Sequence, residues 1–180
     1  MGWDTEATLF LNGLTGSSTF IDSLIVFLAS YLPWLLIVAF LALLYSSAET
    51  KKGEIYVFGV TMISAAIARF GLVEIIRLFF HRPRPFLALP QIHALFKDTE
   101  WSFPSGHASF FFAMAMAIYL YNKKWGVWFF IATIIVTVSR VAAGVHYPTD
   151  ILAGLVVGVC AALAARYIAE KFKLKEMIHV

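Results

Sequence analysis

Residues 104–121 read PSGHASFFFAMAMAIYLY, a short polar start followed by an apolar run of helical length. Two further polar clusters, at residues 77–85 and 139–150, stand at similar borders of apolar runs. Almost everything between and around the three clusters is apolar. We therefore expect their cationic and imidazole groups to gather at one membrane surface, as a catalytic site that handles an anion.

The composition supports a membrane setting. The 180 residues are 61% hydrophobic and only 14% charged, and the mean hydropathy is +0.81. These values are typical of a membrane protein. Because each span takes roughly 20 apolar residues, the length suits one compact helical bundle. Residues 1–180 are therefore predicted to form a single domain of the all-α class.

Hydropathy predicts an integral membrane helical bundle with about five transmembrane helices. They are expected at residues 23–45, 55–80, 105–121, 125–142 and 149–168. A short interfacial helix is expected before them, at residues 4–14. The N-terminus has no early Lys or Arg, so it lacks the positive region of a signal peptide and no cleavage is expected.

The distribution of Lys and Arg predicts the orientation, because short cytoplasmic loops are enriched in them. One side of a five-span topology carries most of them: Lys51, Lys52, Lys123, Lys124, Arg166, Lys171, Lys173 and Lys175. That side is predicted to be cytoplasmic, which places the polar clusters on the outer face. Four basic residues oppose this bias unless function holds them on the outer face: Arg82, Arg84, Lys97 and Arg140.

The third cluster, SRVAAGVHYPTD at residues 139–150, holds a histidine and an aspartate four residues apart. If a helix begins near His146, then Asp150 lies on the same face, where its carboxylate fixes the imidazole tautomer and raises its basicity. Pro148 stands between them, and proline is tolerated in a first helical turn. Such a histidine is a competent nucleophile toward phosphorus. Arg140 offers a planar fork of donors that matches the oxygens of a phosphate.

The second cluster, PSGH at residues 104–107, immediately precedes an apolar run. Proline and serine are good helix-opening residues, and a helix N-terminus presents unpaired N–H groups that bind phosphate. Gly106 lets the backbone approach an anion closely. His107 then stands beside that anion as a candidate proton donor to a leaving oxygen.

The first cluster, RLFFHRPRP at residues 77–85, supplies two more cations, Arg77 and Arg84. Its prolines stiffen the exit from the second predicted span. Arg69 and Glu74 lie earlier in that span, and an intramembrane ion-paired patch is their simpler interpretation. An ionisable residue within a span is nonetheless a functional candidate by default. Glu74 is also spaced to orient Arg77, three residues further along the helix.

Other classes of site and partner are disfavoured. The net charge is only +3 and the basic residues form no continuous stripe, so nucleic acid is not an expected partner. The single cysteine, Cys160, lies in an apolar run and is predicted to be a small buried residue. A zinc site built from histidines is a formal alternative, but their spacings match no usual zinc pattern: His81, His93, His107 and His146.

Together the clusters resemble the signature motifs of the type 2 phosphatidic acid phosphatase and haloperoxidase superfamily. The resemblance covers residues 77–150 and keeps both motif order and internal spacing: Arg77-x6-Arg84-Pro85, Pro104-Ser105-Gly106-His107 and Ser139-Arg140-x5-His146-x3-Asp150. The family usually begins its first motif with Lys, where this chain has Arg77. The positive charge is kept, but the donor geometry differs.

The resemblance implies an integral membrane lipid phosphatase with a role for each motif residue. His146 would attack phosphorus to form a phosphohistidine, supported by Asp150, and His107 would protonate the leaving group. The phosphoryl oxygens would be held by the remaining groups: Arg77, Arg84, Arg140, Ser105 and the Gly106 amide. The family requires neither metal nor cofactor, and the sequence has no carboxylate cluster near the motifs suited to magnesium.

The substrate is predicted from the setting. A phosphate site at a membrane surface favours a lipid whose head group stays wet while its chain stays in the bilayer. The first prediction, from the resemblance to short bacterial members of the superfamily, is undecaprenyl diphosphate, cleaved to undecaprenyl phosphate on the periplasmic or outer face of the inner (plasma) membrane. Phosphatidylglycerophosphate or phosphatidic acid is the alternative substrate.

A protein that binds or transports an anionic lipid without cleaving it is an alternative of another class. The oligomeric state stays open.

Overall fold

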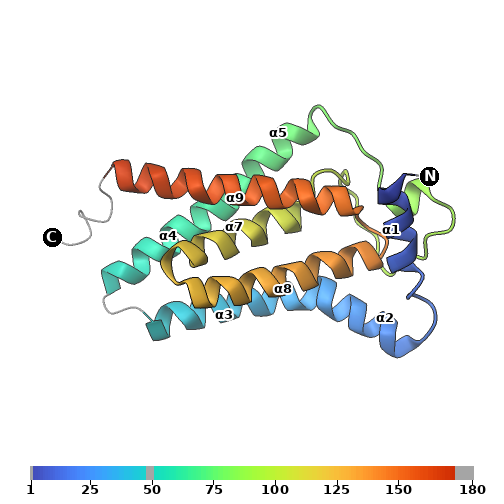
Figure 1. Ribbon diagram of the computed structural model, residues 1–180, viewed down its shortest axis with the longest axis horizontal. Coiled ribbons are helices and arrows are strands. Elements are labelled where there is room, and N and C mark those ends of the chain that lie inside the picture. The colour runs from blue at the N-terminus through green and yellow to red at the C-terminus, as the bar shows by residue number, and fades with distance from the viewer. Residues whose placement is uncertain (1, 48–50, 173–180) are drawn as a thin grey trace.

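The computed structural model describes residues 2–47 and 51–172, and these residues form only helices and loops. The predicted all-α class is confirmed. The helices, of which η1 and η2 are π-helices, follow one another in this order (Figure 1): α1 (Trp3–Asn12), α2 (Thr19–Val26), η1 (Phe27–Tyr31), α3 (Leu32–Ser47), α4 (Lys51–Ala66), η2 (Ile67–Leu72), α5 (Val73–Arg77), α6 (Pro85–Ala88), α7 (Gly106–Tyr121), α8 (Lys123–Ala142) and α9 (Pro148–Lys171).

Four stretches of the described chain are long and apolar enough to cross a bilayer. They are Thr19–Ser46, Ile55–Arg77, Lys123–Ala142 and Pro148–Lys171, and each matches one predicted span. The remaining predicted span is α7, whose 16 residues form a shorter apolar helix. At 1.5 Å per residue it reaches about 24 Å, less than the roughly 30 Å of the hydrocarbon core.

Helix α7 lies in the middle of the bundle and packs against α9, α8 and α4 (Figure 1). Two glycines of α9 let it come close. A Cβ on Gly154 would lie 2.6 Å from Ala108 Cβ, and one on Gly158 would lie 2.6 Å from the Ser109 carbonyl oxygen. This pair of small residues therefore serves helix packing inside one subunit.

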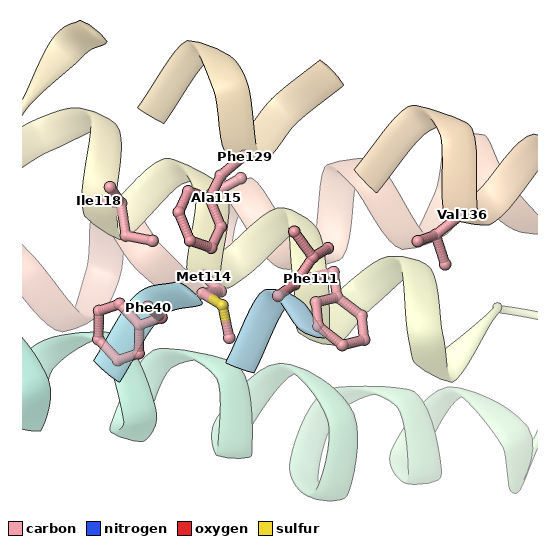
Figure 2. Packing of buried hydrophobic residues seen from close by; sticks show 8 residues of the cluster. Phe40, Phe111, Met114, Ala115, Ile118, Phe129 and Val136 are labelled. Carbon is pink, nitrogen blue, oxygen red and sulfur yellow. The ribbon is translucent and has the colours of Figure 1, made fainter. Parts of the chain in front are cut away.

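A buried apolar cluster joins α3, α7 and α8 (Figure 2). Its members labelled there are Phe40, Phe111, Met114, Ala115, Ile118, Phe129 and Val136. The outer surface is also apolar, with large exposed side chains such as Trp34, Val138 and Leu152. A helical bundle whose surroundings are lipid is expected to look this way. Cys160 belongs to this outer surface, so the prediction that it is buried is wrong.

Two π-helical turns interrupt the first two spans, η1 between α2 and α3 and η2 between α4 and α5. Pro33 follows η1 closely and has no N–H to donate to the Ala29 carbonyl four residues earlier. That carbonyl is available to another donor. Turns of this kind are frequent at functional sites.

Helix α1 corresponds to the predicted interfacial helix and packs on α8 and α9. Its buried Asn12 makes three hydrogen bonds. The side-chain amide donates to the carbonyls of His93 (2.9 Å) and Ala142 (2.8 Å), and its oxygen accepts from the His93 N–H (2.8 Å). Helix α1 thus fixes the long loop before α7 against the end of α8.

Candidate active site

The three polar clusters meet at one end of the bundle, near α1 (Figure 1). They enclose a cavity of about 150 Å³. All three clusters contribute to its lining, together with one arginine and two acidic residues from outside them: Arg69, Arg77, Arg84, Asp98, Glu100, Gly106, His107 and His146.

His146 and Asp150 lie together, as the sequence predicts. Helix α9 has Tyr147 as its N-cap and Pro148 as its first residue, so Asp150 is in the first turn. The Asp150 carboxylate accepts the Tyr147 N–H at 2.8 Å and lies 3.4 Å from His146 Nδ1. Proline suits the first helical position, and an acid at the third position satisfies a free N–H group. The four-residue spacing therefore survives the intervening proline.

The neighbours of His146 define its tautomer. The Arg84 guanidinium can only donate, and it donates from Nη1 to His146 Nε2 at 3.3 Å. Nε2 therefore carries the lone pair, and the proton lies on Nδ1, which faces Asp150. Burial lowers the pKa of His146 to about 4, against the hydrogen bond to Asp150 and with help from nearby arginine charges. At neutral pH the imidazole is neutral, with an unprotonated nitrogen at the cavity.

Asp150 has further partners that the sequence did not reveal. Arg82 donates to its Oδ1 at 2.9 Å, and the Ser102 hydroxyl donates to its Oδ2. Arg82 is held in turn by Asp4 of α1 at 2.6 Å, and its guanidinium lies 3.7 Å from the centre of the Tyr147 ring. Since both oxygens of the fully buried Asp150 are occupied, its orientation is fixed.

Arg84 and Arg140 form a first cationic position. Arg84 Nη2 forms an ion pair with Asp98 Oδ2 at 3.0 Å, and Arg140 Nη2 donates to the same oxygen at 3.2 Å. Burial lowers the pKa of Arg84, and the Asp98 charge opposes that shift. Arg140 also donates to the Ala29 carbonyl at 3.3 Å, the group that Pro33 cannot satisfy. The two guanidinium groups therefore converge on one carboxylate.

Arg69 and Arg77 form a second cationic position. Glu100 Oε2 lies 2.8 Å from Arg69 Nη2 and 2.5 Å from Arg77 Nη1. Glu74 contacts both arginines as well, at 2.5 Å and 3.2 Å. Although partial burial raises the pKa of Glu100, the two arginines hold it below its ordinary value. The ion-paired patch expected for Arg69 and Glu74 is present, and so is the contact of Glu74 with Arg77.

The second cluster forms the start of α7. Ser105 is the N-cap, and its hydroxyl accepts the Ala108 N–H at 3.4 Å. Ser105 is buried and is not among the residues that line the cavity, so its phosphate-binding role stays a prediction. Gly106 lies against Arg69, since a Cβ there would be 2.5 Å from Arg69 Nε. His107 lines the cavity.

A mainly apolar groove of about 260 Å³ adjoins the cavity. It is bordered by the first two spans and by α7, with these lining residues: Ser30, Pro33, Trp34, Ile37, Arg69, Phe70, Gly106, His107, Phe110 and Phe111. Arg69, Gly106 and His107 line the cavity too. The polar cavity and the apolar groove therefore meet at these three residues.

One known family matches the part of the chain that carries all three motifs. The PAP2 superfamily matches residues 55–174, which is 120 of the 180 residues. The chain belongs to the PAP2 superfamily. The resemblance inferred from the three motifs is thereby confirmed, and so is the assignment to membrane phosphatases of this family.

Individual PAP2 relatives agree with this assignment. Undecaprenyl-diphosphatase BcrC of Bacillus subtilis (strain 168) is 30% identical over 151 residues, which cover 83% of this chain and 75% of the relative. The Bacillus licheniformis protein named bacitracin transport permease protein BcrC is 30% identical over 171 residues, 92% of this chain and 80% of the relative. Aquifex aeolicus LpxE has a similar crystal structure, with a TM-score of 0.75 at 22% identity, covering 93% of this chain and 96% of that one. The chain is an integral membrane protein with the PAP2 fold.

Four polar residues that contact the PAP2 motif residues were not predicted: Arg82, Asp98, Glu100 and Ser102. Arg82 lies at an unspecified position within the first motif, and the other three lie between the first and second motifs, in a stretch without a periodic pattern. One signal was available, because Asp98 and Glu100 are the only acidic residues between positions 78 and 105. Carboxylates placed among so many cations are expected to pair with them.

Proposed function

We propose that the chain hydrolyses a polyprenyl diphosphate, first of all undecaprenyl diphosphate, with His146 as the nucleophile. The observation that carries this proposal is the unprotonated His146 Nε2 at a small cavity lined by three arginines. Phosphate oxygens are negatively charged and repel most nucleophiles. A neutral imidazole surrounded by fixed positive charge avoids that repulsion.

In the first step, His146 Nε2 attacks the terminal phosphorus, and the bond from that phosphorus to the bridging oxygen breaks. The electron pair stays on the lipid monophosphate, and His107 donates a proton to it. Water then attacks the phosphohistidine and gives up a proton to His107, which releases inorganic phosphate and frees Nε2. Asp150 accepts the Nδ1–H bond throughout and stabilises the positive charge that develops on the ring.

The remaining motif groups bind the phosphoryl oxygens. Arg84 is nearest to the nucleophile, and Arg77 and Arg140 add charge around it. The Ser105 hydroxyl and the Gly106 N–H, at the start of α7, add neutral donors for the phosphoryl oxygens. Together these donors neutralise charge that builds in the transition state. Independence from metal ions stays a prediction that a chelator tests.

The lipid part of the substrate follows from the apolar groove beside the cavity. A chain in the groove places its head group at the residues shared with the cavity: Arg69, Gly106 and His107. The name of the Bacillus subtilis relative supports a polyprenyl diphosphate. The transport name of the Bacillus licheniformis relative keeps the binding-only alternative worth testing.

The site is proposed to face the periplasm or the cell exterior from a bacterial plasma membrane. The start of α8 and the end of α9 lie at the end of the bundle opposite α1 (Figure 1). These helix ends carry Lys123, Lys124 and Lys171, which fits the positive-inside rule. Lys173 and Lys175, which contributed to this prediction, lie outside the described residues. Labelling of cysteines introduced at Lys123 and His93 in intact cells tests it. Preferential labelling at position 123 contradicts the proposed orientation and indicates the opposite one.

The decisive experiment measures phosphate release by the purified protein in detergent with a chelator present. Undecaprenyl diphosphate, phosphatidylglycerophosphate and phosphatidic acid are compared, with His146→Ala as the control. We expect phosphate release to be fastest from undecaprenyl diphosphate and to be lost in His146→Ala. Retained turnover in His146→Ala removes the phosphohistidine mechanism. Binding of the lipid without any release supports the transport alternative.

A further inference from the structure

Two carboxylates from one loop fill two neighbouring cationic positions at the cavity. Carboxylates and phosphates use the same guanidinium donors, so each carboxylate marks a place that suits an anion. The contacts are Asp98 with Arg84 (3.0 Å) and Arg140 (3.2 Å), and Glu100 with Arg77 (2.5 Å) and Arg69 (2.8 Å). The site therefore has two anion positions, whereas a phosphate monoester fills only one.

The two positions have different neighbours. Arg84 Nη1 lies 3.3 Å from His146 Nε2, so the first position is beside the nucleophile. Arg69 lines the apolar groove as well as the cavity, so the second position is on the lipid side. A substrate that runs from the nucleophile to the groove meets the first anion position, then the second, and then the apolar surface.

We propose that Arg69, together with Arg77, binds the lipid-side phosphate of a diphosphate and so selects diphosphates over monophosphates. This inference rests on the proposed function and names the residue that recognises the second phosphate. Arg69 lies outside the three motifs, so neither the motifs nor their spacing assign it a role.

Arg69 is built into this place by its surroundings. It lies on the π-helical turn η2, and the missing side chain of Gly106 makes room for its guanidinium, which a Cβ would approach to 2.5 Å. Glu74 holds its Nη1 from the side. The neighbouring Arg77 is buried, and its Nε has no hydrogen-bond partner among the described residues. An ion pair serving helix stability alone needs neither the gap at Gly106 nor a place in the cavity wall.

The second position also has a chemical consequence. When the terminal phosphorus is attacked by His146, the bond to the bridging oxygen breaks and its electron pair passes to the lipid monophosphate. The new negative charge therefore appears on the phosphate beside Arg69, where a guanidinium stabilises it. A lipid monophosphate has no second phosphate beside Arg69, so Arg69 is expected to accelerate its cleavage little.

The test uses substrates that differ by one phosphate, farnesyl diphosphate and farnesyl monophosphate, with wild type and Arg69→Gln. We expect kcat/KM for the diphosphate to fall roughly ten- to hundredfold, and for the monophosphate by less than about threefold. Arg69→Lys keeps the charge without the fork and is expected to recover part of the selectivity. Arg166→Gln is the matched control, because Arg166 pairs with Glu170 on the exposed face of α9, 2.7 Å away, far along the helix from the cavity.

The outcomes separate this inference from the proposed function. If the wild type releases no phosphate from the diphosphate, both fail. If it does, but Arg69→Gln and Arg69→Lys slow both substrates equally, Arg69 has only a structural role and the inference alone is overturned. If Arg69→Gln does not fold, the diphosphate-to-monophosphate ratio of Arg69→Lys decides, and an unchanged ratio overturns the inference.

Discussion

Two sets of acidic residues lie at the candidate site, and they contact its arginines in different ways. Asp150 has no exposed side-chain surface, and its two oxygens contact four groups from three separate segments. Asp98 and Glu100 are 28% and 46% exposed, and they contact arginines at or beside the cavity. One carboxylate is enclosed behind the candidate nucleophile, and the other two lie where a substrate must enter.

This difference separates a fixed part of the site from groups that a substrate displaces. A buried charge is stable only when it is fully paired, so the position of Asp150 is tightly determined. The carboxylates of Asp98 and Glu100 are partly open to solvent, and a multiply charged phosphate competes with them for the same guanidinium donors. Substitutions in the two sets are therefore expected to change activity in opposite directions.

The largest effect is expected for Asp150→Asn. The amide cannot accept all the hydrogen bonds that reach the carboxylate, and it removes the charge that supports a positive His146. We expect kcat to fall on the order of 10²- to 10⁴-fold with KM little changed. Phosphate release under saturating lipid measures this, with Glu170→Gln at the far end of α9 as the control. A loss below about threefold places Asp150 outside the catalytic machinery.

The second prediction concerns pH. His146 must be neutral to attack, and burial lowers its pKa to about 4. Activity is therefore kept as the pH falls through 6.5 and is lost only near pH 4. The acid limb of kcat/KM against pH reports the pKa of His146 in the free enzyme. The pKa of the substrate, about 6 for a phosphate monoester, is determined separately by ³¹P NMR so that the two ionisations can be distinguished. In Asp150→Asn the limb moves lower still, because the carboxylate raises this pKa. A wild-type midpoint near 6.5 contradicts the buried, neutral imidazole.

Arg82→Gln is expected to have a smaller effect. Arg82 contacts Asp150 at 2.9 Å and is 30% exposed, so it positions the carboxylate without reaching the cavity wall. We expect kcat to fall roughly tenfold and KM to stay constant. Asp4→Asn should cost less, since Asp4 reaches Asp150 only through Arg82 and Thr149. A change in KM without a change in kcat assigns Arg82 to substrate binding instead.

The helices and the motif geometry were predictable for a physical reason. The spans were predictable because a helix that crosses lipid needs a long apolar run. The contact between His146 and Asp150 was predictable because helical spacing and a proline in the first turn fix their relative position locally. The fifth predicted span, α7, is shorter than the other four but is central in the bundle, so its length need not match the bilayer. Cys160 was misplaced because in a membrane protein the apolar residues of a span face lipid as well as the core.

The contacts made by the loop before α7 were not predictable, because they depend on the whole fold. Asp98 and Glu100 reach their arginines only when α1, the end of α8 and this loop are in place, and Asn12 is what ties these three together. Arg69 gave an ambiguous signal. Its ion pair with Glu74 was expected from local spacing, but its place at the border of cavity and groove comes from the approach of α7.

The smallest effect, and the one of opposite sign, is expected for Asp98→Asn. The carboxylate neutralises Arg84 and Arg140, so an entering phosphate must replace it before it can bind beside His146. An amide competes less well for guanidinium donors, so we expect the inhibition constant of inorganic phosphate to fall roughly two- to fivefold, with KM following it. Glu170→Gln, which removes an exposed carboxylate paired with Arg166, serves as the control. A fall in kcat as large as that of Asp150→Asn means that Asp98 is a fixed part of the site, because a displaced group has no contact left to lose once the substrate is bound.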